Sequence, residues 1–276
     1  MTILSRRNFL ISGSKVTLTG LLVGAPLDEM LGGSQLFAKS FENNIYSPNV
    51  WIHIPKEGKI SLVVHRSEMG QQIRTSCVML LAEELKVNVD DIQVIQADGD
   101  KKYGDQNTDG SKSARKNFTP LRLAGAQTRE LLISAAAKKW KIPVSKISAS
   151  EGVIKNSVNT NMLHYQELGH LASKQVPAKK PKLLSTTAKK SRIVGKFQKG
   201  LDNEDIVRGK IVFGMDVEVE GMIYASLARA PAPWASNLKS FDKKAALSVS
   251  GVKKVVQLEG QSQPINTNDS VAVVAT

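Results

Sequence analysis

The chain of 276 residues contains a single cysteine, Cys77, and few aromatic residues. One cysteine excludes an internal disulfide and an iron–sulfur cluster held by four thiolates of this chain, so any such cluster must lie on a partner. Because Cys77 stands in an apolar run with helical spacing, we interpret it as a core residue. Aromatic residues make up 5% of the chain, which is too few for a platform that stacks nucleic-acid bases.

Acidic residues are also scarce relative to basic ones. The chain has 38 Lys and Arg against 25 Asp and Glu, which gives a formal net charge of +13. Such a charge suits nucleic acid, an anionic membrane surface or an acidic partner. A nucleic-acid-binding protein is nevertheless not expected, because no groove-reading or stacking motif accompanies the charge. With 41% apolar residues, the chain is able to bury a sizeable core in one or two domains.

A long uninterrupted hydrophobic run is missing as well. Residues 5–10, with the pair Arg6 and Arg7, match the twin-arginine export pattern, and residues 11–27 form an apolar region too polar for a stable transmembrane helix. We predict a signal peptide over residues 1–38 and a periplasmic protein that is exported folded, with membrane association as a further option. The alternative is an amphipathic N-terminal helix.

A strand, a glycine turn and a helix follow one another near residue 70. The alternating run 59–64 predicts a strand that pairs with residues 50–54 as a hairpin, and the periodic run 73–85 predicts a helix. At this corner Gly70 lets the backbone approach a ligand, and we expect the first amides of the helix to hold an anion. The alternative is an ordinary corner whose polar residues face solvent.

Residues 98–117 show no periodicity, and a loop of this length inside a domain is usually functional or disordered. Its hydroxyl and glycine residues over 108–113 suit phosphate or pterin oxygens. Thr119 and Pro120 predict the start of a helix that runs to Trp140. A short strand at 152–154 and a small helix from Tyr165 follow.

The second half of the chain begins with a charge run. Residues 174–199 hold nine basic residues and no acid, which predicts a solvated linker. Beyond it, residues 208–216 and 221–231 predict two strands around a turn, and a helix from Lys243 precedes a strand at 251–256. Neither His53 nor His65 has two further ligands at metal spacing, so we interpret both as structural.

The segment from Ser67 to Thr75, followed by residues 81–85, closely resembles the E-M-G-Q-G-x-x-T…A-E-E-L signature of the molybdenum hydroxylases, the xanthine oxidase and aldehyde oxidoreductase family. Residues 64–66, 103–106 and 110–113 resemble the isoquinoline 1-oxidoreductase beta-subunit branch. Gln72 stands where the signature has its second glycine, and we expect its side chain to crowd the cofactor. Asp109 replaces a glycine of the family's T-G-G-S-x-S loop and adds a negative charge.

The resemblance implies an α+β fold, with a partial molybdopterin-binding domain followed by a truncated a/b hammerhead domain. The implied organisation is a signal peptide at 1–38, a molybdopterin-binding segment at 39–172, a basic linker at 173–200 and an incomplete hammerhead domain at 201–276. The implied cofactor is molybdopterin, expected only in the full-length subunit. The implied cofactor-binding residues are Met69, Gly70, Gln71, Thr75, Thr108, Gly110, Ser111 and Ser113, with Gln71 and Ser111 facing one shared cavity.

The resemblance also implies an oxidoreductase that hydroxylates an N-heterocycle or an aldehyde with water as oxygen source. The family's catalytic glutamate lies near the end of a longer subunit, and Glu68, Glu83 and Glu84 do not match its motif. We therefore expect the chain to be roughly the first third of a subunit and silent alone. Its expected partners are a small [2Fe-2S] subunit and the remainder of its own large subunit. A non-catalytic remnant or one piece of a split subunit is the alternative.

Overall fold

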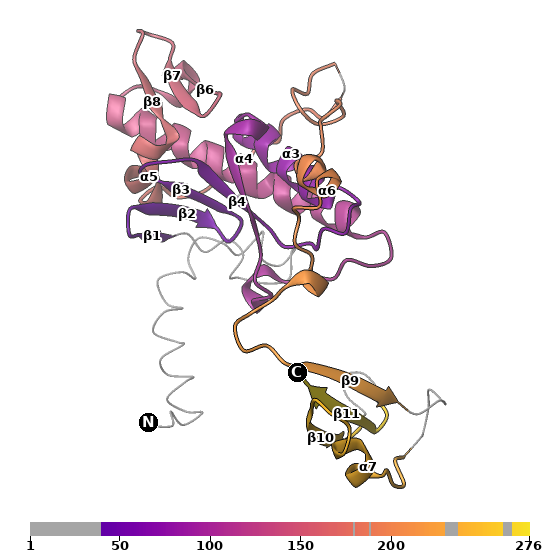
Figure 1. Cartoon of the computed structure of the whole chain (residues 1–276). Helices are drawn as coiled ribbons and strands as arrows, with labels where there is room; N and C mark the ends of the chain where they lie inside the picture. The colour runs from indigo at the N-terminus through magenta and orange to yellow at the C-terminus, as the bar shows by residue number, and fades with distance from the viewer. Residues whose placement is uncertain (1–39, 179, 188, 230–236, 262–266) are drawn as a thin grey trace, which may run out of the picture. The chain divides into compact units, whose positions relative to one another are not determined.

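The computed structural model describes residues 40–276 except 179, 188, 230–236 and 262–266 (Figure 1). The expected signal peptide therefore lies outside the described residues. The chain divides into two compact units, of which the first ends at Ile211 and the second covers Val212–Thr276. In the part of the chain that the structure describes, no helix combines the length and the apolar character needed to cross a membrane.

The first unit is built on a sheet of five strands, which lie side by side in their chain order. The strands are β1 (Ser40–Glu42), β2 (Ile45–Asn49), β3 (Ile52–Pro55), β4 (Ile60–Val64) and β5 (Ile92–Gln96). Strands β1 to β4 pair antiparallel, so the predicted hairpin is confirmed in β3 and β4. Strands β4 and β5 pair parallel, and a parallel pair needs a crossover connection.

Three helices cover this sheet (Figure 1). They are α3 (Ile73–Leu85), which makes the crossover, α4 (Ser113–Trp140) and α5 (Tyr165–Ser173). Helices α3 and α5 contact the sheet, and α4 packs against both of them. Helix α3 is confirmed at the residues that its apolar period predicts.

The predicted start of the next helix at Thr119 is wrong, because α4 begins at Ser113 and Pro120 lies inside it. A proline in a helix interior leaves the carbonyl four residues earlier, here that of Lys116, without its usual N–H partner. The added turns before Pro120 are mostly polar and have no apolar period, so the sequence pattern does not reveal them.

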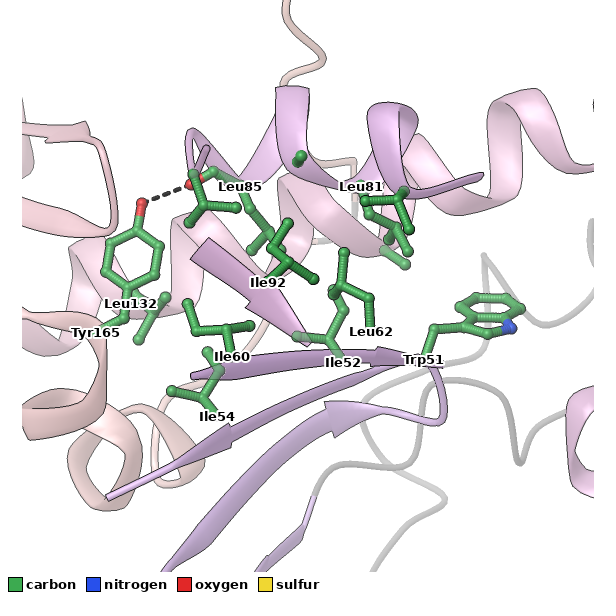
Figure 2. Close-up of a cluster of buried hydrophobic side chains, with 14 of the residues drawn as sticks. Trp51, Ile52, Ile54, Ile60, Leu62, Leu81, Leu85, Ile92, Leu132 and Tyr165 are labelled. Atoms are coloured by element: carbon green, nitrogen blue, oxygen red, sulfur yellow. Dashed lines mark hydrogen bonds between the residues drawn. The ribbon is translucent and has the colours of Figure 1, made fainter. Parts of the chain in front are cut away.

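The core of the first unit lies between the sheet and the helices (Figure 2). Ile52 and Leu62 of the sheet, Leu81 of α3 and Leu132 of α4 belong to this cluster, and all four side chains are fully buried. Burial of such a side chain contributes about 1.5–3 kcal/mol. Tyr165 closes one end of the core, where its hydroxyl donates to the carbonyl oxygen of Leu85 at 2.6 Å.

Helices α3 and α4 approach each other closely at Gly125. A Cβ atom at Gly125 would lie 2.8 Å from the Cβ atom of Glu84, which is closer than side chains pack. Glu84 is fully buried at this crossing, and its carboxylate accepts from Arg122 Nε at 2.9 Å and from Arg129 Nη1 at 3.0 Å. The crossing therefore encloses one buried acid between two cations.

The segment predicted as a solvated linker is instead fastened to these helices. We call the described residues between 182 and 203 the strap. The carboxylate of Glu84 accepts from the Leu184 amide at 3.0 Å, and that of Glu83 accepts from the Arg192 and Val194 amides at 3.0 and 3.1 Å. Glu83 is also buried. The structure differs from the expectation because two buried carboxylates supply acceptors for the backbone of the basic run.

Smaller elements complete the first unit. A second antiparallel sheet consists of β6 (Ile147–Ser150), β7 (Val153–Asn156) and β8 (Met162–His164). The short helices are η2 (Val89–Asp91), η3 (Lys101–Tyr103), η4 (Val144–Lys146) and α6 (Asn203–Val207).

The second unit contains an antiparallel sheet in which β11 (Ser270–Ala275) lies between β10 (Val252–Leu258) and β9 (Tyr224–Arg229). Helix α7 (Lys243–Leu247) and the strand after Gly251 agree with the sequence pattern. The strand predicted over 208–216 is wrong, because that stretch forms irregular backbone and the short helix η5 (Gly214–Asp216) and has no partner strand among the described residues. Both units mix helices with small sheets, so the predicted α+β class is confirmed.

Candidate functional site

The corner between β4 and α3 is organised around one acid, Glu68. Its Oε1 atom accepts from the amides of Gly70 and Gln72, both at 2.9 Å, and its Oε2 atom accepts from the amide of Arg74 at 3.1 Å. Arg74 is in the first turn of α3, so a protein carboxylate occupies the position where a ligand anion was expected. The carboxylate of Glu68 therefore already accepts from one of the first amides of α3, that of Arg74, and from two amides of the turn before the helix.

Two residues of the corner have left-handed backbone, namely Gly70 with φ 90° and Gln72 with φ 66°. Glycine adopts this conformation freely, whereas another residue carries a cost of about 1–2 kcal/mol. The side chain of Gln72 turns to the strap, where its Nε2 atom donates to Asn203 Oδ1 at 2.6 Å and its Oε1 atom accepts from Thr75 Oγ1 at 3.2 Å. The expectation that Gln72 crowds the cofactor pocket is wrong, because its amide points to these partners.

The hydroxyl-rich loop ends in a tight turn just before α4. Gly110 and Ser111 both have φ 52°, and the Lys112 amide donates to the Asp109 carbonyl at 3.1 Å. The carboxylate of Asp109 lies 3.5 Å from Lys112 Nζ. The turn therefore directs the chain into α4, whose first residue is Ser113.

Two neighbouring residues tie the corner to this loop. Ser67 donates its amide to Thr108 Oγ1 at 3.0 Å, and the buried guanidinium of Arg66 donates to the Asn107 carbonyl and lies 3.4 Å from the Asp105 carboxylate. A hydrogen bond from Lys116, the Asn107 amide and the charge of Arg66 lower the pKa of Asp105 to about 2. Asp105 is thus ionised at neutral pH and keeps Arg66 paired.

His65 contacts the end of the same loop through Asn117. Its Nε2 atom donates to Asn117 Oδ1 at 2.9 Å, and Asn117 Nδ2 donates to the carbonyl of Ser113 at 2.7 Å. Burial lowers the pKa of His65 to about 4, although the hydrogen bond to Asn117 acts in the opposite direction. A neutral His65 therefore helps to position the first turn of α4.

The corner and the loop line an open pocket of about 480 Å³. Of the predicted site residues, Met69, Gln71, Thr108, Gly110, Ser111 and Ser113 line it, so Gln71 and Ser111 face one cavity as the sequence predicts. The lining also includes Asp109, the acid that the sequence analysis places in this loop. Sequence reasoning missed three further lining residues, which are Ile73, Ser76 and Ala114. The helical period offers a signal for Ser76, which lies three residues after Ile73 on the same face of α3.

Gly70 and Thr75, the other two predicted residues, do not line the pocket. Gly70 meets no atom within 4 Å at the position of a Cβ, so its left-handed backbone accounts for the glycine better than a close approach does. Thr75 is buried, and its Oγ1 atom accepts from the Leu201 amide at 3.0 Å. The structure therefore places Thr75 at the contact between α3 and the strap.

The lining offers hydroxyl groups more than charges. Within the described part of the chain, no protein group is hydrogen-bonded to the hydroxyl of Ser111 or Ser113, and the first turn of α4 contains no acid. The Gln71 amide folds back on its own turn, where Oε1 accepts from the Met69 amide at 2.6 Å and Nε2 donates to the Ser67 carbonyl at 3.0 Å. Among the described residues, no group of three or more His, Cys, Asp or Glu side chains could hold a metal ion.

Comparisons with known proteins identify similar chains. Isoquinoline 1-oxidoreductase subunit beta of Brevundimonas diminuta is 29% identical over 298 aligned positions, which cover 92% of this chain and 37% of that protein. The membrane-bound aldehyde dehydrogenase (pyrroloquinoline-quinone) of Gluconacetobacter polyoxogenes is 26% identical over 276 positions, which cover 95% of this chain and 34% of that protein. The chain thus spans about a third of the length of these curated relatives.

A solved structure, that of Cu,Mo-CO dehydrogenase, is similar over 42% of this chain and 15% of that chain, with 19% identity and a TM-score of 0.37. The family model described as the molybdopterin cofactor-binding domain matches residues 29–220, which is well over half of the chain. The chain therefore belongs to the molybdopterin cofactor-binding domain family of the molybdenum hydroxylases, whose cofactor is molybdopterin.

Proposed function

We propose that the chain forms one side of the cofactor pocket in a molybdopterin-dependent oxidoreductase subunit. The observation that supports the proposal is the pocket itself, which joins the glycine corner to the hydroxyl loop across a sequence separation of 41 residues. Its volume of about 480 Å³ lies in the range of cofactor sites, which is roughly 300–1,000 Å³.

The residues of the pocket suit molybdopterin. Helix α4 has 28 residues, and no side chain caps its first amides, so its N-terminus favours an anionic group such as a phosphate. The hydroxyls of Ser111 and Ser113 add donors at the same end. Met69, a residue that is 64% exposed, offers an apolar surface to a flat heterocycle, and Gln71 offers an amide. Met69, Gln71, Ser111 and Ser113 are therefore the residues that would hold the cofactor.

Asp109 does not oppose this assignment. It is the acid that replaces a glycine of the family's loop, and it lines the pocket. Its carboxylate lies 3.5 Å from Lys112 Nζ, which offsets its charge. An anionic cofactor would therefore meet an ion pair at this position.

The bound molybdenum cofactor would supply the redox chemistry that hydroxylates a carbon of an N-heterocycle or an aldehyde with water as oxygen source. The residues of this chain would orient the cofactor. Glu68 accepts three backbone amides, and Glu83 and Glu84 are buried beneath the strap, so none of these acids lines the pocket. Asp109 does line the pocket, but its carboxylate is paired with Lys112. We therefore propose that the proton acceptor for the reaction comes from elsewhere and that the chain is inactive by itself.

The remaining parts of the proposal concern partners and location. We propose that the remainder of the large subunit supplies the catalytic base and that a small [2Fe-2S] subunit receives the electrons, because the one cysteine of this chain cannot ligate a cluster. The names of the two curated relatives support an aldehyde or an N-heterocycle as substrate. The twin-arginine pattern in residues 1–38 supports a periplasmic protein.

The test measures how much pterin co-purifies with the chain from cells that synthesise the molybdenum cofactor. Bound pterin is oxidised to its fluorescent form and quantified per chain. We expect less than one pterin per chain, because one side of the pocket binds weakly. The double variant Ser111→Ala/Ser113→Ala should retain about tenfold less, since each hydroxyl contributes about 0.5–1.5 kcal/mol.

Ser148→Ala is the matched control, because Ser148 is exposed on β6, away from the pocket. Equal pterin in the double variant and the control would contradict the assignment of the pocket. Turnover of an aldehyde or an N-heterocycle by the isolated chain, with an artificial electron acceptor, would contradict the proposal that it is inactive by itself.

A further inference from the structure

Four consecutive residues of the strap, 200–203, contact the corner that lines the pocket. Leu201 donates its amide to Thr75 Oγ1 at 3.0 Å, and the Asp202 carboxylate lies 3.1 Å from the Arg74 guanidinium. Asn203 accepts from Gln72 Nε2 at 2.6 Å across a sequence separation of 131 residues. The first turn of α3 is therefore bound to a segment that lies far away in the sequence.

Gln72 is the residue through which this contact reaches the pocket. Its two chain neighbours, Gln71 and Ile73, both line the pocket. Its carbonyl accepts from both the amide and the hydroxyl of Ser76, another lining residue, at 3.1 Å each. The conformation of Gln72 thus determines where three lining side chains lie.

Gln72 keeps a left-handed conformation that favours glycine, with φ 66° and ψ 28°. The left-handed backbone costs free energy at a glutamine, so contacts that form only in this conformation must offset that cost. The side chain makes such contacts with Asn203 and Thr75. The glutamine that departs from the family's glycine therefore carries its own compensating partner.

Gly200 leaves the room that the Gln72 amide occupies. A Cβ atom at Gly200 would lie 2.1 Å from Gln72 Oε1 and 2.5 Å from Asn203 Oδ1. The φ of Gly200 lies outside the left-handed region, so alanine fits its backbone. A methyl group at this position would therefore displace the side-chain amides of Gln72 and Asn203, while the backbone of residue 200 keeps an allowed conformation.

We propose that Gln72, Asn203 and Gly200 form a latch that positions the pocket-facing corner. Asn203 and Gly200 act through Gln72 and are positioning residues. The latch couples the strap to the shape of the pocket, and its importance for the cofactor depends on the proposed function.

Hydrogen exchange measured by mass spectrometry on the full 276-residue chain tests the latch without any ligand. Asn203→Ala and Gly200→Ala should each speed exchange in peptides covering residues 67–76 by about threefold to tenfold, the effect of one lost hydrogen bond. Asn203→Asp keeps an acceptor oxygen for Gln72 Nε2 and should exchange like the wild type. Glu204→Ala is the neighbouring control, because its exposed carboxylate pairs with exposed Arg208.

A double-mutant cycle separates the latch from a general loosening of the strap. In a Gln72→Gly background, Asn203→Ala should add no further change at the corner, because the glutamine amide is already absent. The proposal is overturned if Asn203→Ala or Gly200→Ala exchanges like Glu204→Ala, or if Asn203→Ala acts equally in both backgrounds. Faster exchange throughout Leu80–Leu85 would also overturn it, because Asn203 would then support the whole helix.

Pterin retention distinguishes this inference from the proposed function. If the latch positions a cofactor pocket, Asn203→Ala should retain severalfold less pterin than Asn203→Asp. If the variants show the expected hydrogen exchange but the chain never retains pterin, the latch is supported and the proposed function is rejected.

Discussion

Removal of the Glu84 carboxylate should destabilise the first unit more than any surface substitution. Glu84 is fully buried and accepts from Arg122, Arg129 and the Leu184 amide at 2.8–3.0 Å. In Glu84→Ala both guanidinium groups stay buried, because each side chain is less than a tenth exposed, and they lose their counter-charge.

The magnitude follows from the cost of an unpaired buried charge. Breaking a buried ion pair from one side costs about 3–5 kcal/mol, out of a total stability of roughly 5–15 kcal/mol. With a urea dependence near 2 kcal/mol per molar, the midpoint of unfolding should fall by about 2 M. Glu84→Gln keeps one acceptor oxygen and should lie between Glu84→Ala and the wild type.

Urea unfolding of the full chain, followed by tryptophan emission, measures the change, because buried Trp51 reports on the first unit. Glu57→Ala is the control, since Glu57 is exposed in the turn between β3 and β4 and its loss should cost less than about 0.5 kcal/mol. A midpoint for Glu84→Ala equal to that of Glu57→Ala would refute the reasoning that the buried acid holds the helix crossing and the strap together.

Two further predictions concern titratable groups. The pKa of His65 is lowered from 6.5 to about 4 by burial, so between these pH values the unfolded chain binds a proton that the folded chain does not. The unfolding free energy should therefore fall by up to about 3 kcal/mol as the pH drops from 6.5 to 4, and this part of the pH dependence should be missing in His65→Gln when urea midpoints are compared. Burial raises the pKa of the Cys77 thiol to about 12, so a thiol reagent should label the native chain very slowly and one thiol per chain in concentrated guanidinium chloride. Rapid labelling of the native chain would show that Cys77 lies outside the core.

The sequence predicts those elements whose signal is local. The apolar run of residues 73–85 is sufficient to place α3, and ten of its thirteen residues are buried. The start of α4 is not predictable in the same way. Its first turns are polar, and Pro120 is a stronger local signal for a helix start than Ser113 is. Long-range packing overrides that local preference.

The strap shows the same difference between local and distant causes. A run of basic residues with no acid predicts a solvated segment when its own residues are considered alone. The acceptors that bind it, Glu83 and Glu84, lie about a hundred residues earlier in the sequence, on α3. No pattern within the run reports a partner at that distance.

The pocket was largely predictable because its residues fall in two compact motifs. Gln71 and Ser111 were expected to share a cavity, and they do. The roles of Glu68 and Thr75 were not predictable, because a motif records which residues occur together and not which of them bond to one another. The structure shows that Glu68 holds the corner and that Thr75 meets the strap.

The carboxylate of Glu68 has a consequence for affinity. It accepts from three backbone amides of the corner, so a group of the protein itself holds the conformation of this turn. Under the proposed function, cofactor binding would cost little conformational freedom at this corner, and more of the contact energy would remain as net binding. An internal anion of this kind makes the corner a preorganised surface.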